Sequence, residues 1–359
     1  MIIINTKVAF GLSILTILVG SLFLVLNLSF SFSKPQTRVG VYYYPWYPLH
    51  WNYSKEYPKW NVVDTPVSSV LGYYDCQNET AVKQQLTWME ESGIDFIVLS
   101  WWGNKDWGYG YYGDATCQFI FQVIKQYKYN ITAALMVESF NGTVYDFQNI
   151  YDYVYGTYVV PYDSIYMKLD KLPILCFYNG EITKNGMVGS DNQGRFQTRI
   201  VGHSPYVDWW FAIPCTVNNS TIPPLSKKDG MICVEPRYDD QFIYRTENST
   251  FDPSLSEGLY AKQWNEALRL ARESKVNLVI IYSWNEYHER SQIEPCNDST
   301  SYQPENTTLN LEKTRYFISQ IKSKELYPMS PLVLIGSGLI VTGTLTSGYF
   351  IYKRKKFNK

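Results

Sequence analysis

The segment from Val276 to Pro295, which reads VNLVIIYSWNEYHERSQIEP, decides the fold. Its apolar, β-branched part runs from Leu278 to Tyr282 without polar alternation. This predicts a strand buried on both faces, as in a parallel sheet. A polar cluster follows at once, with Asn285, Glu286, His288 and Glu289. Reactive side chains at the C-terminal end of a buried parallel strand are the usual site geometry of α/β barrels.

Glu286 and Glu289 stand three residues apart. In one helical turn the two side chains would share a face, with Cβ atoms roughly 5–6 Å apart. That spacing suits two carboxylates that divide acid and base work at one glycosidic bond. A solvated loop or a structural ion-pair network is the alternative interpretation, and spacing alone does not separate the two.

Composition narrows the function classes. The 359 residues suit one large domain or two small ones, and a net charge of −1 gives no indication of nucleic-acid binding. Aromatic residues make up 17% of the chain, which fits a carbohydrate-binding surface, although Tyr and Trp also fill cores. With three histidines and no C-x-x-C spacing, we expect no metal site and no cofactor.

Two uncharged apolar runs bracket the chain, Val8 to Phe32 and Pro331 to Tyr352. At 1.5 Å per residue each could cross a bilayer core of about 30 Å. The basic residues 353–356 after the second run should stay in the cytoplasm. We expect the first run to be an uncleaved anchor, with a cleaved signal peptide as the alternative. The expected organisation is an anchor over 1–33, a barrel over 34–327, a transmembrane helix over 328–352 and a basic tail over 353–359.

N-x-S/T triplets and cysteines agree with a cell-membrane protein whose catalytic domain is extracytoplasmic. The triplets concentrate between the two apolar runs, beginning at Asn52, Asn78, Asn130, Asn141, Asn218, Asn219, Asn248, Asn297 and Asn306. All six cysteines lie there too, where disulfides are permitted. Cys176 and Cys233 stand in apolar runs and could equally be buried thiols.

Strand and helix patterns alternate between the apolar runs. We expect strands at 38–44, 94–100, 131–137, 173–177, 209–213, 230–234 and 278–282, and helices at 79–92, 116–127, 144–155, 260–274 and 310–324. The remainder of 180–228 gives no clear pattern. This alternation predicts a single (β/α)₈ TIM barrel, with a doubly wound open sheet as the rival. No Gly-rich phosphate loop and no G-x-S-x-G elbow occur, which disfavours nucleotide binding and α/β-hydrolase chemistry.

Five segments resemble, in the same order, segments of family 99 glycoside hydrolases, the endo-α-mannosidase type. They read VYYYPWY, LGYYD, GIDFIVLSWWG, EPRYDD and WNEYHERSQIEP, and they lie between Val39 and Pro295. The resemblance implies a (β/α)₈ fold and metal-independent, retaining hydrolysis of an α-mannosidic linkage inside a glycan. The implied partners are therefore an α-mannose-containing glycan or polysaccharide and, through the anchors, the membrane.

Matching to the family assigns roles by position. Glu286 would be the base that draws the proton from the substrate's own 2-hydroxyl, giving a 1,2-anhydro sugar. Glu289 would protonate the leaving oxygen and later activate water, so neither carboxylate attacks the sugar itself. The substrate site would be lined by Tyr44, Trp46, His50, Trp51, Trp102, Glu138, Tyr178 and Asp239, with Asn285 and His288 beside the glutamate pair.

The chain departs from the family pattern near the pair. Tyr287 replaces the usual Trp, Arg290 and Ser291 replace the usual Gly-Thr, and Pro48 replaces a Gly. If Arg290 pairs with Glu289 it would lower the pKa of that carboxyl, whereas a general acid needs a raised pKa. Two other functions stay open: a non-catalytic glycan-binding or surface-polysaccharide assembly protein, and a structural cell-surface protein. Retention of both carboxylates favours the enzyme.

Overall fold

The computed structural model describes residues 36–49, 51, 67–104, 110–138, 144–178, 189–202, 207–211, 224–238, 258–298 and 308–323. All of them except Gln36 belong to one compact unit, Thr37–Ser323. The expected anchor, C-terminal span and basic tail lie outside the described residues, as do His50 and Asp239. Within the described ranges, no helix is long and apolar enough to cross a membrane.

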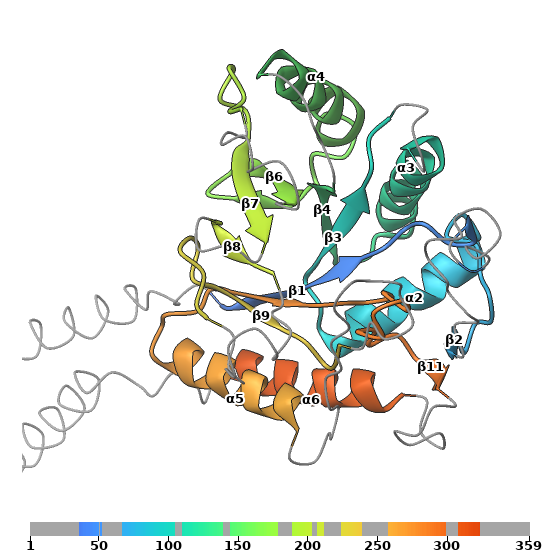
Figure 1. The fold of residues 1–359 in the computed structure, drawn as a ribbon, viewed down its shortest axis with the longest axis vertical. Coiled ribbons are helices and arrows are strands. Elements are labelled where there is room, and N and C mark those ends of the chain that lie inside the picture. The colour runs from blue at the N-terminus through green and yellow to red at the C-terminus, as the bar shows by residue number, and fades with distance from the viewer. Residues whose placement is uncertain are drawn as a thin grey trace, which may run out of the picture. The chain divides into compact units, whose positions relative to one another are not determined.

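Eight parallel strands form a nearly closed barrel at the centre of this unit (Figure 1). In spatial order they are β9 (Met231–Val234), β10 (Leu278–Ile281), β1 (Arg38–Tyr43), β3 (Phe96–Trp101), β4 (Thr132–Val137), β6 (Leu172–Tyr178), β7 (Gln197–Gly202) and β8 (Trp209–Trp210). At the seam between β8 and β9, the Trp210 N–H donates to Ser226 Oγ at 2.9 Å. The arrangement agrees with the predicted (β/α)₈ barrel.

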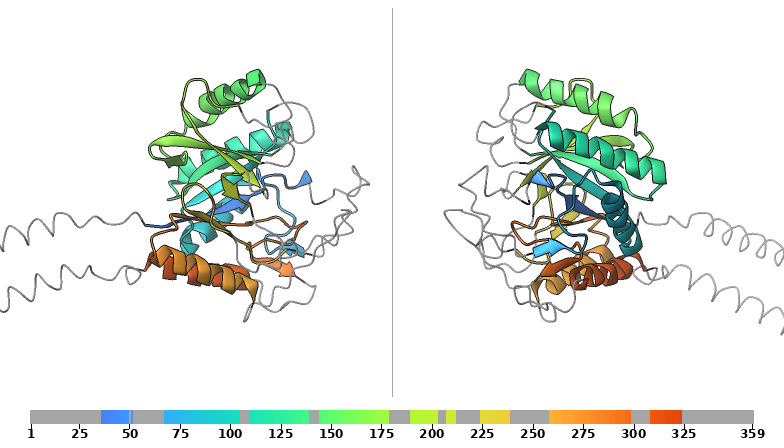
Figure 2. Two further views of the ribbon diagram at one scale, coloured as in Figure 1. Left: turned by 60° about the vertical axis from the view of Figure 1, so that its left-hand side comes forward. Right: turned by 90° about the vertical axis from the view of Figure 1, so that its right-hand side faces the viewer.

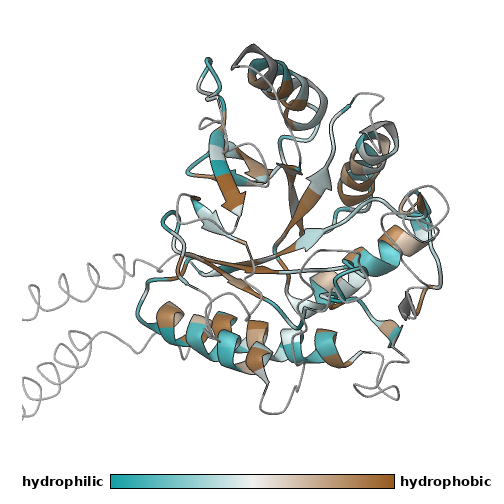
Figure 3. Cartoon of the chain, in the orientation of Figure 1, coloured by the Kyte–Doolittle hydropathy of each residue, from teal (hydrophilic) through white to brown (hydrophobic). Residues whose placement is uncertain are grey.

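The described helices surround the strands (Figures 1 and 2). They are α2 (Glu79–Ser92), α3 (Gly110–Tyr127), α4 (Val144–Val154) with the π-helical turn η2 (Tyr155–Val159), α5 (Leu259–Arg272) and α6 (Leu309–Lys322). Two short antiparallel pairs add β2 (Val67–Ser69) to β11 (Cys296–Asp298), and β5 (Lys168–Leu169) to β6. In Figure 3, apolar residues run through the central strands, whereas α5 and α6 alternate between apolar and polar positions.

Helix α2 shows how local sequence sets these elements. Asn78 Oδ1 accepts a hydrogen bond from the Ala81 N–H at 3.1 Å, and Gly93 ends the helix with φ 82. An N-cap side chain satisfies a free N–H of the first turn, and glycine adopts the left-handed conformation without a Cβ penalty. Both helix limits agree with the sequence prediction.

Strand β1 sends its side chains alternately to the two faces of the barrel wall. Tyr43 points outward, where its hydroxyl donates to Gln85 Oε1 of α2 at 2.6 Å. Tyr42 takes the opposite face, where its ring packs 4.8 Å from Phe211 and 6.3 Å from Tyr282. By the same alternation Tyr44, just after the strand, faces inward with Tyr42. The sequence of β1 thus aims one tyrosine at the helix layer and two at the interior.

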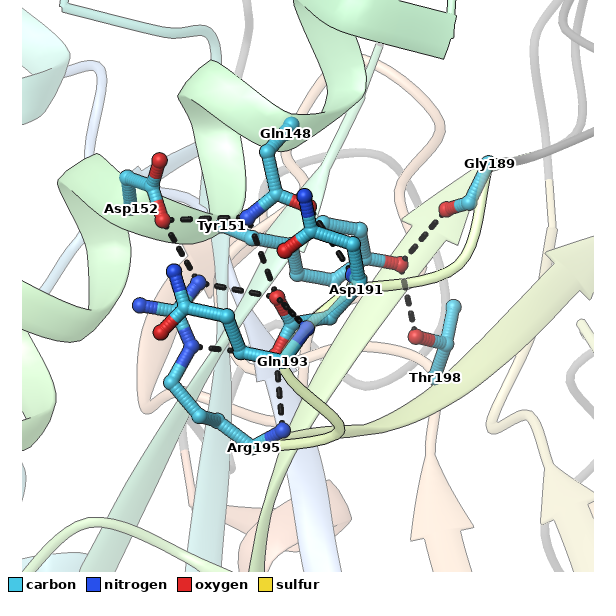
Figure 4. Close-up of polar contacts among 9 residues, drawn as sticks. Gln148, Tyr151, Asp152, Gly189, Asp191, Gln193, Arg195 and Thr198 are labelled. Atoms are coloured by element: carbon cyan, nitrogen blue, oxygen red, sulfur yellow. Dashed lines mark hydrogen bonds and ion pairs between the residues drawn. The ribbon is translucent and has the colours of Figure 1, made fainter.

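Strand β7 was not predicted from the sequence, and the strand expected at 209–213 is limited to Trp209–Trp210. The segment that leads into β7 is held by Asp191, which accepts hydrogen bonds from Arg195 and Gln148 (Figure 4). Arg195 also pairs with Asp152 of α4 at 2.6 Å. Burial alone would raise the pKa of Asp191, but the hydrogen bonds from Arg195 and Gln148 lower it to about 2. This ionic cluster fixes β7 to the helix layer.

Candidate active site

Most of the predicted site residues meet at one end of the barrel. Parallel strands place their C-terminal ends at the same rim. The described residues found there are Asn285, Glu286, His288 and Glu289 after β10, Tyr44 and Trp46 after β1, Trp102 after β3, Glu138 after β4, and Tyr178 at the end of β6.

Glu286 is buried in the turn that follows β10. Its Oε1 accepts a hydrogen bond from the His288 backbone N–H at 3.0 Å and lies 3.1 Å from His288 Nδ1. The Glu286 N–H donates to Ser283 Oγ at 2.9 Å. Burial raises the pKa of Glu286, and the nearby Glu289 raises it further, while the contacts with His288 lower it. A carboxylate with a raised pKa is a stronger base near neutral pH.

Glu289 is held between two tyrosines. The Tyr282 hydroxyl donates to Oε2, and the Tyr238 hydroxyl donates to Oε1 at 3.3 Å. Tyr282 directly follows β10 and Tyr238 lies in the segment after β9, so two neighbouring strand ends fix this carboxyl group. Donors on both oxygens fix the orientation of the group.

Glu138 is a third carboxyl at the same rim. It is 8% exposed, and its Oε1 has no hydrogen-bond partner among the described residues. Burial raises the pKa of Glu138 to about 8; the Ser100 hydroxyl lowers it, and Glu286 and Glu289 raise it. The charges of all three carboxyls therefore act on one another. At neutral pH Glu138 carries a proton and can donate a hydrogen bond to a ligand.

Aromatic rings stand beside Glu286. The Tyr44 ring lies 4.7 Å from that of Trp46, and Trp46 lies 6.4 Å from Trp102 and 6.1 Å from the His288 ring. Such faces suit the apolar C–H surfaces of a sugar ring. Tyr178 packs 5.2 Å from Phe211, whose ring lies 4.6 Å from that of Tyr282.

Two predicted site residues, Asn285 and Trp51, hold the segment after β1 in place. Asn285 is fully buried, and its side chain pairs with Tyr44, accepting from the N–H at 2.8 Å and donating to the carbonyl at 3.0 Å. Trp51 stacks on Tyr47 at 4.0 Å and donates from Nε1 to the Tyr74 carbonyl at 2.7 Å. Both residues fasten the segment after β1 to its neighbours, so their contacts in this structure are with protein groups.

Two buried carboxyls, Glu235 and Glu294, lie in the quoted segments but were not predicted as site residues. Neither oxygen of Glu235 has a hydrogen-bond partner within the described ranges. Burial and the charge of Glu289 raise the pKa of Glu235 well above its ordinary value. Glu294 accepts four hydrogen bonds. Within the same ranges, no group of three His, Cys, Asp or Glu side chains could hold a metal ion.

One departure from the family pattern lies at a backbone position that favours glycine. Arg290, where the resembled family usually has glycine, adopts φ 50, the left-handed conformation that glycine takes most readily. Its backbone carbonyl accepts a hydrogen bond from Arg237 Nε at 2.5 Å. The segment after β9 thus contacts the glutamate loop through both Arg237 and Tyr238.

Comparisons with known proteins find similar sequences. No family model matches the chain. A glycoprotein endo-alpha-1,2-mannosidase of Rattus norvegicus is 23% identical over 358 residues, covering 80% of this chain and 75% of the relative. A glycoprotein endo-alpha-1,2-mannosidase-like protein of Mus musculus is 24% identical over 360 residues, covering 80% and 78%.

Solved structures show the same fold. The GH99 endo-alpha-mannosidase from Bacteroides thetaiotaomicron superposes with a TM-score of 0.58 at 15% identity, covering 80% of this chain and 98% of that chain. Its complex with BIS-TRIS-propane gives 0.58 at 17% identity, covering 79% and 97%. Barrel, carboxyl cluster and homologues together support a glycoside hydrolase. Within that class the similarity is to family 99, at low identity.

Proposed function

We propose that this protein hydrolyses an α-mannosidic linkage within a glycan or polysaccharide and retains the anomeric configuration. The observation that carries the proposal is the buried pair Glu286 and Glu289 at the end of β10. The curated relatives named endo-alpha-1,2-mannosidases support the substrate class. In this proposal Glu286 is the base and Glu289 is the acid.

The reaction has two steps. Glu286 removes the proton of the sugar's 2-hydroxyl, whose oxygen attacks the anomeric carbon to form a 1,2-anhydro sugar. At the same time the bond to the leaving oxygen breaks and Glu289 gives that oxygen a proton. Glu289 then takes a proton from water, which opens the anhydro ring at the anomeric carbon, and Glu286 returns the proton to the 2-oxygen. Two inversions at one carbon give net retention.

The surrounding residues fit these roles. The raised pKa of Glu286 favours proton removal from a weakly acidic hydroxyl. Protonated Glu138 offers a hydrogen-bond donor to a sugar hydroxyl, and the rings of Tyr44, Trp46 and Trp102 offer apolar faces. We propose that these side chains, with His288 and Tyr178, bind the sugar.

The test uses the full-length chain with α-mannan oligosaccharides, followed by NMR to read product release and anomeric form. We expect a product that retains the anomeric configuration of the substrate. We also expect Glu286→Gln and Glu289→Gln each to reduce the rate of product release by roughly 10²–10⁴-fold. Wild type that binds mannan without cleaving it, with variants that bind equally well, would instead favour the alternative function of a glycan-binding or polysaccharide-assembly protein.

We further propose that the barrel is held on the extracytoplasmic side of the cell membrane, with the basic tail in the cytoplasm. The uncharged runs 8–32 and 331–352 support two spans, or one if the first is cleaved. Among the described sequons, Asn78, Asn130 and Asn297 are exposed. Protease digestion of intact cells should remove a tag inserted in the barrel and spare one at the C-terminus. Release of the protein by an alkaline wash of membranes would contradict the anchoring.

A further inference from the structure

Glu294 ends the polar segment that begins at Asn285, and it is 1% exposed. Its Oε1 accepts hydrogen bonds from Ser69 Oγ at 3.1 Å and from Gln85 Nε2 at 2.8 Å. Its Oε2 accepts from the hydroxyls of Tyr74 at 2.9 Å and Tyr287 at 2.6 Å. Four donors from separate segments therefore fill the acceptor sites of one carboxylate.

The other hydrogen bonds of these donors fix where their protons point. Gln85 Oε1 accepts from the Tyr43 hydroxyl at 2.6 Å, so the Gln85 amide group faces Glu294. Ser69 Oγ accepts from the Leu71 N–H at 3.1 Å, which leaves its own proton for Glu294. The cluster is thus complete for an ionised carboxyl, whereas a protonated Glu294 would bring one donor too many.

The Tyr74 hydroxyl is oriented in the same way, and it links the cluster to the glutamate pair. It accepts from Asn285 Nδ2 at 3.1 Å while it donates to Glu294. Tyr287 follows Glu286 directly and donates to the same carboxyl. The two residues on either side of Glu286, Asn285 and Tyr287, are therefore both held by Glu294, one through Tyr74 and one directly.

We infer that Glu294 is a positioning residue for Glu286, and that its ionised form assembles the loop that carries this base. The effect of Glu294 on catalysis rests on the proposed function. Its structural role in the loop rests on the hydrogen bonds alone. Loss of one of these bonds would remove a constraint on Asn285 or Tyr287, and a displacement of about 1 Å at a reacting group can cost roughly 10²-fold in rate.

Lowering the pH should protonate Glu294 and leave one donor of the cluster without an acceptor. Burial raises the pKa of Glu294 to about 7, although the hydrogen bonds from Tyr287, Gln85, Tyr74 and Ser69 lower it. The titratable groups that face it are Tyr43, Tyr74, Tyr287 and Cys76, and burial raises the pKa of each of them well above neutrality. Between about pH 8 and 6, Glu294 is therefore the group of the cluster that gains a proton.

The experiment compares full-length wild type with Glu294→Gln and Tyr287→Phe. Infrared difference spectra between pH 8 and pH 6 detect the protonated carboxyl directly, and kcat and KM on α-mannan oligosaccharides follow its effect on the site. Compared with wild type, Glu294→Gln should lose the carboxyl signal that titrates near pH 7, while that of Glu138, whose pKa lies at about 8, should remain. We expect the same variant to lower kcat roughly 10- to 100-fold with little change in KM. Tyr287→Phe should move that signal to higher pH by about one unit, because it removes one donor to the carboxylate.

Two results would overturn the inference. One is an infrared titration near pH 7 that is identical in wild type and Glu294→Gln. The other is a Glu294→Gln variant with wild-type kcat and an unchanged pH profile. If wild type cleaves no substrate, the proposed function fails while the infrared titration still decides whether Glu294 holds the cluster. If Glu294→Gln does not fold, the displaced titration of Tyr287→Phe decides, and an unmoved signal counts against the role.

Discussion

Glu138 should lower the free energy of unfolding of the barrel by an amount that depends on pH. Burial raises the pKa of this carboxyl from an ordinary 4.5 to about 8. Between these values the unfolded chain releases the proton that the native protein retains. Because the native state binds more protons, the free energy of unfolding must fall as the pH rises through this window.

Glu138→Gln removes this dependence while keeping the size of the side chain. Relative to wild type, its free energy of unfolding should increase by about 1.4 kcal/mol for each pH unit between 4.5 and 8. The stabilisation should be small at pH 4.5, reach about 3 kcal/mol at pH 7, and level off near about 5 kcal/mol above pH 8. The same variant should bind mannan more weakly, because a hydrogen-bond partner for the sugar has changed.

Urea unfolding at several pH values between 4.5 and 9 measures this difference. Glu91→Gln on the exposed face of α2 is the matched control for the loss of a carboxyl group. A difference between Glu138→Gln and wild type that does not change with pH would refute the reasoning. It would mean that Glu138 is solvated or paired in the native protein.

Three further outcomes follow from the described contacts. Asp191→Asn should lower the free energy of unfolding by about 2 kcal/mol at pH 7, and in urea or thermal unfolding the difference should disappear as the pH falls from 3.8 through about 2, where the native carboxyl protonates. Gly40→Ala would place a Cβ 2.1 Å from Phe96 Cε2, so we expect a loss of roughly 3 kcal/mol in thermal unfolding, partly restored by Phe96→Leu. Tyr282→Phe removes a donor that holds Glu289 in place and should lower kcat on α-mannan oligosaccharides roughly 10- to 100-fold; an unchanged kcat would count against this contact.

The elements predicted correctly from the sequence are those that depend on neighbouring residues in the chain. The apolar run of β10 is buried along its whole length, and α2 begins and ends at its capping residues. Strand β7 (QTRIVG) was missed because it carries polar residues whose partners are distant in sequence. Arg199 is compensated by Asp229 at 2.5 Å, thirty residues away, so the strand lacks the apolar run that marks its neighbours.

The candidate site likewise contains residues that local motifs identify and residues whose roles depend on distant contacts. Motif order and strand ends led to Glu286, Glu289, Glu138 and the aromatic residues, and the barrel brings them to one rim. The roles of Glu235 and Glu294 depend on burial and on donors such as Ser69 and Gln85, which lie more than two hundred residues before Glu294 in the chain. No spacing rule reports such contacts, because they exist only once the barrel has formed.

The measurement that tests the central claim most directly is kcat/KM of Glu286→Gln and Glu289→Gln on two substrates. One is an α-mannan oligosaccharide, whose leaving oxygen needs a proton, and the other is an α-glycosyl-mannosyl fluoride, whose fluoride leaves without one. With Glu286 as base and Glu289 as acid, Glu286→Gln should lose activity on both substrates, by roughly 10²–10⁴-fold. Glu289→Gln should lose far more on the oligosaccharide than on the fluoride. Wild-type activity in either variant on both substrates, or the reversed pattern of losses, would contradict the assignment.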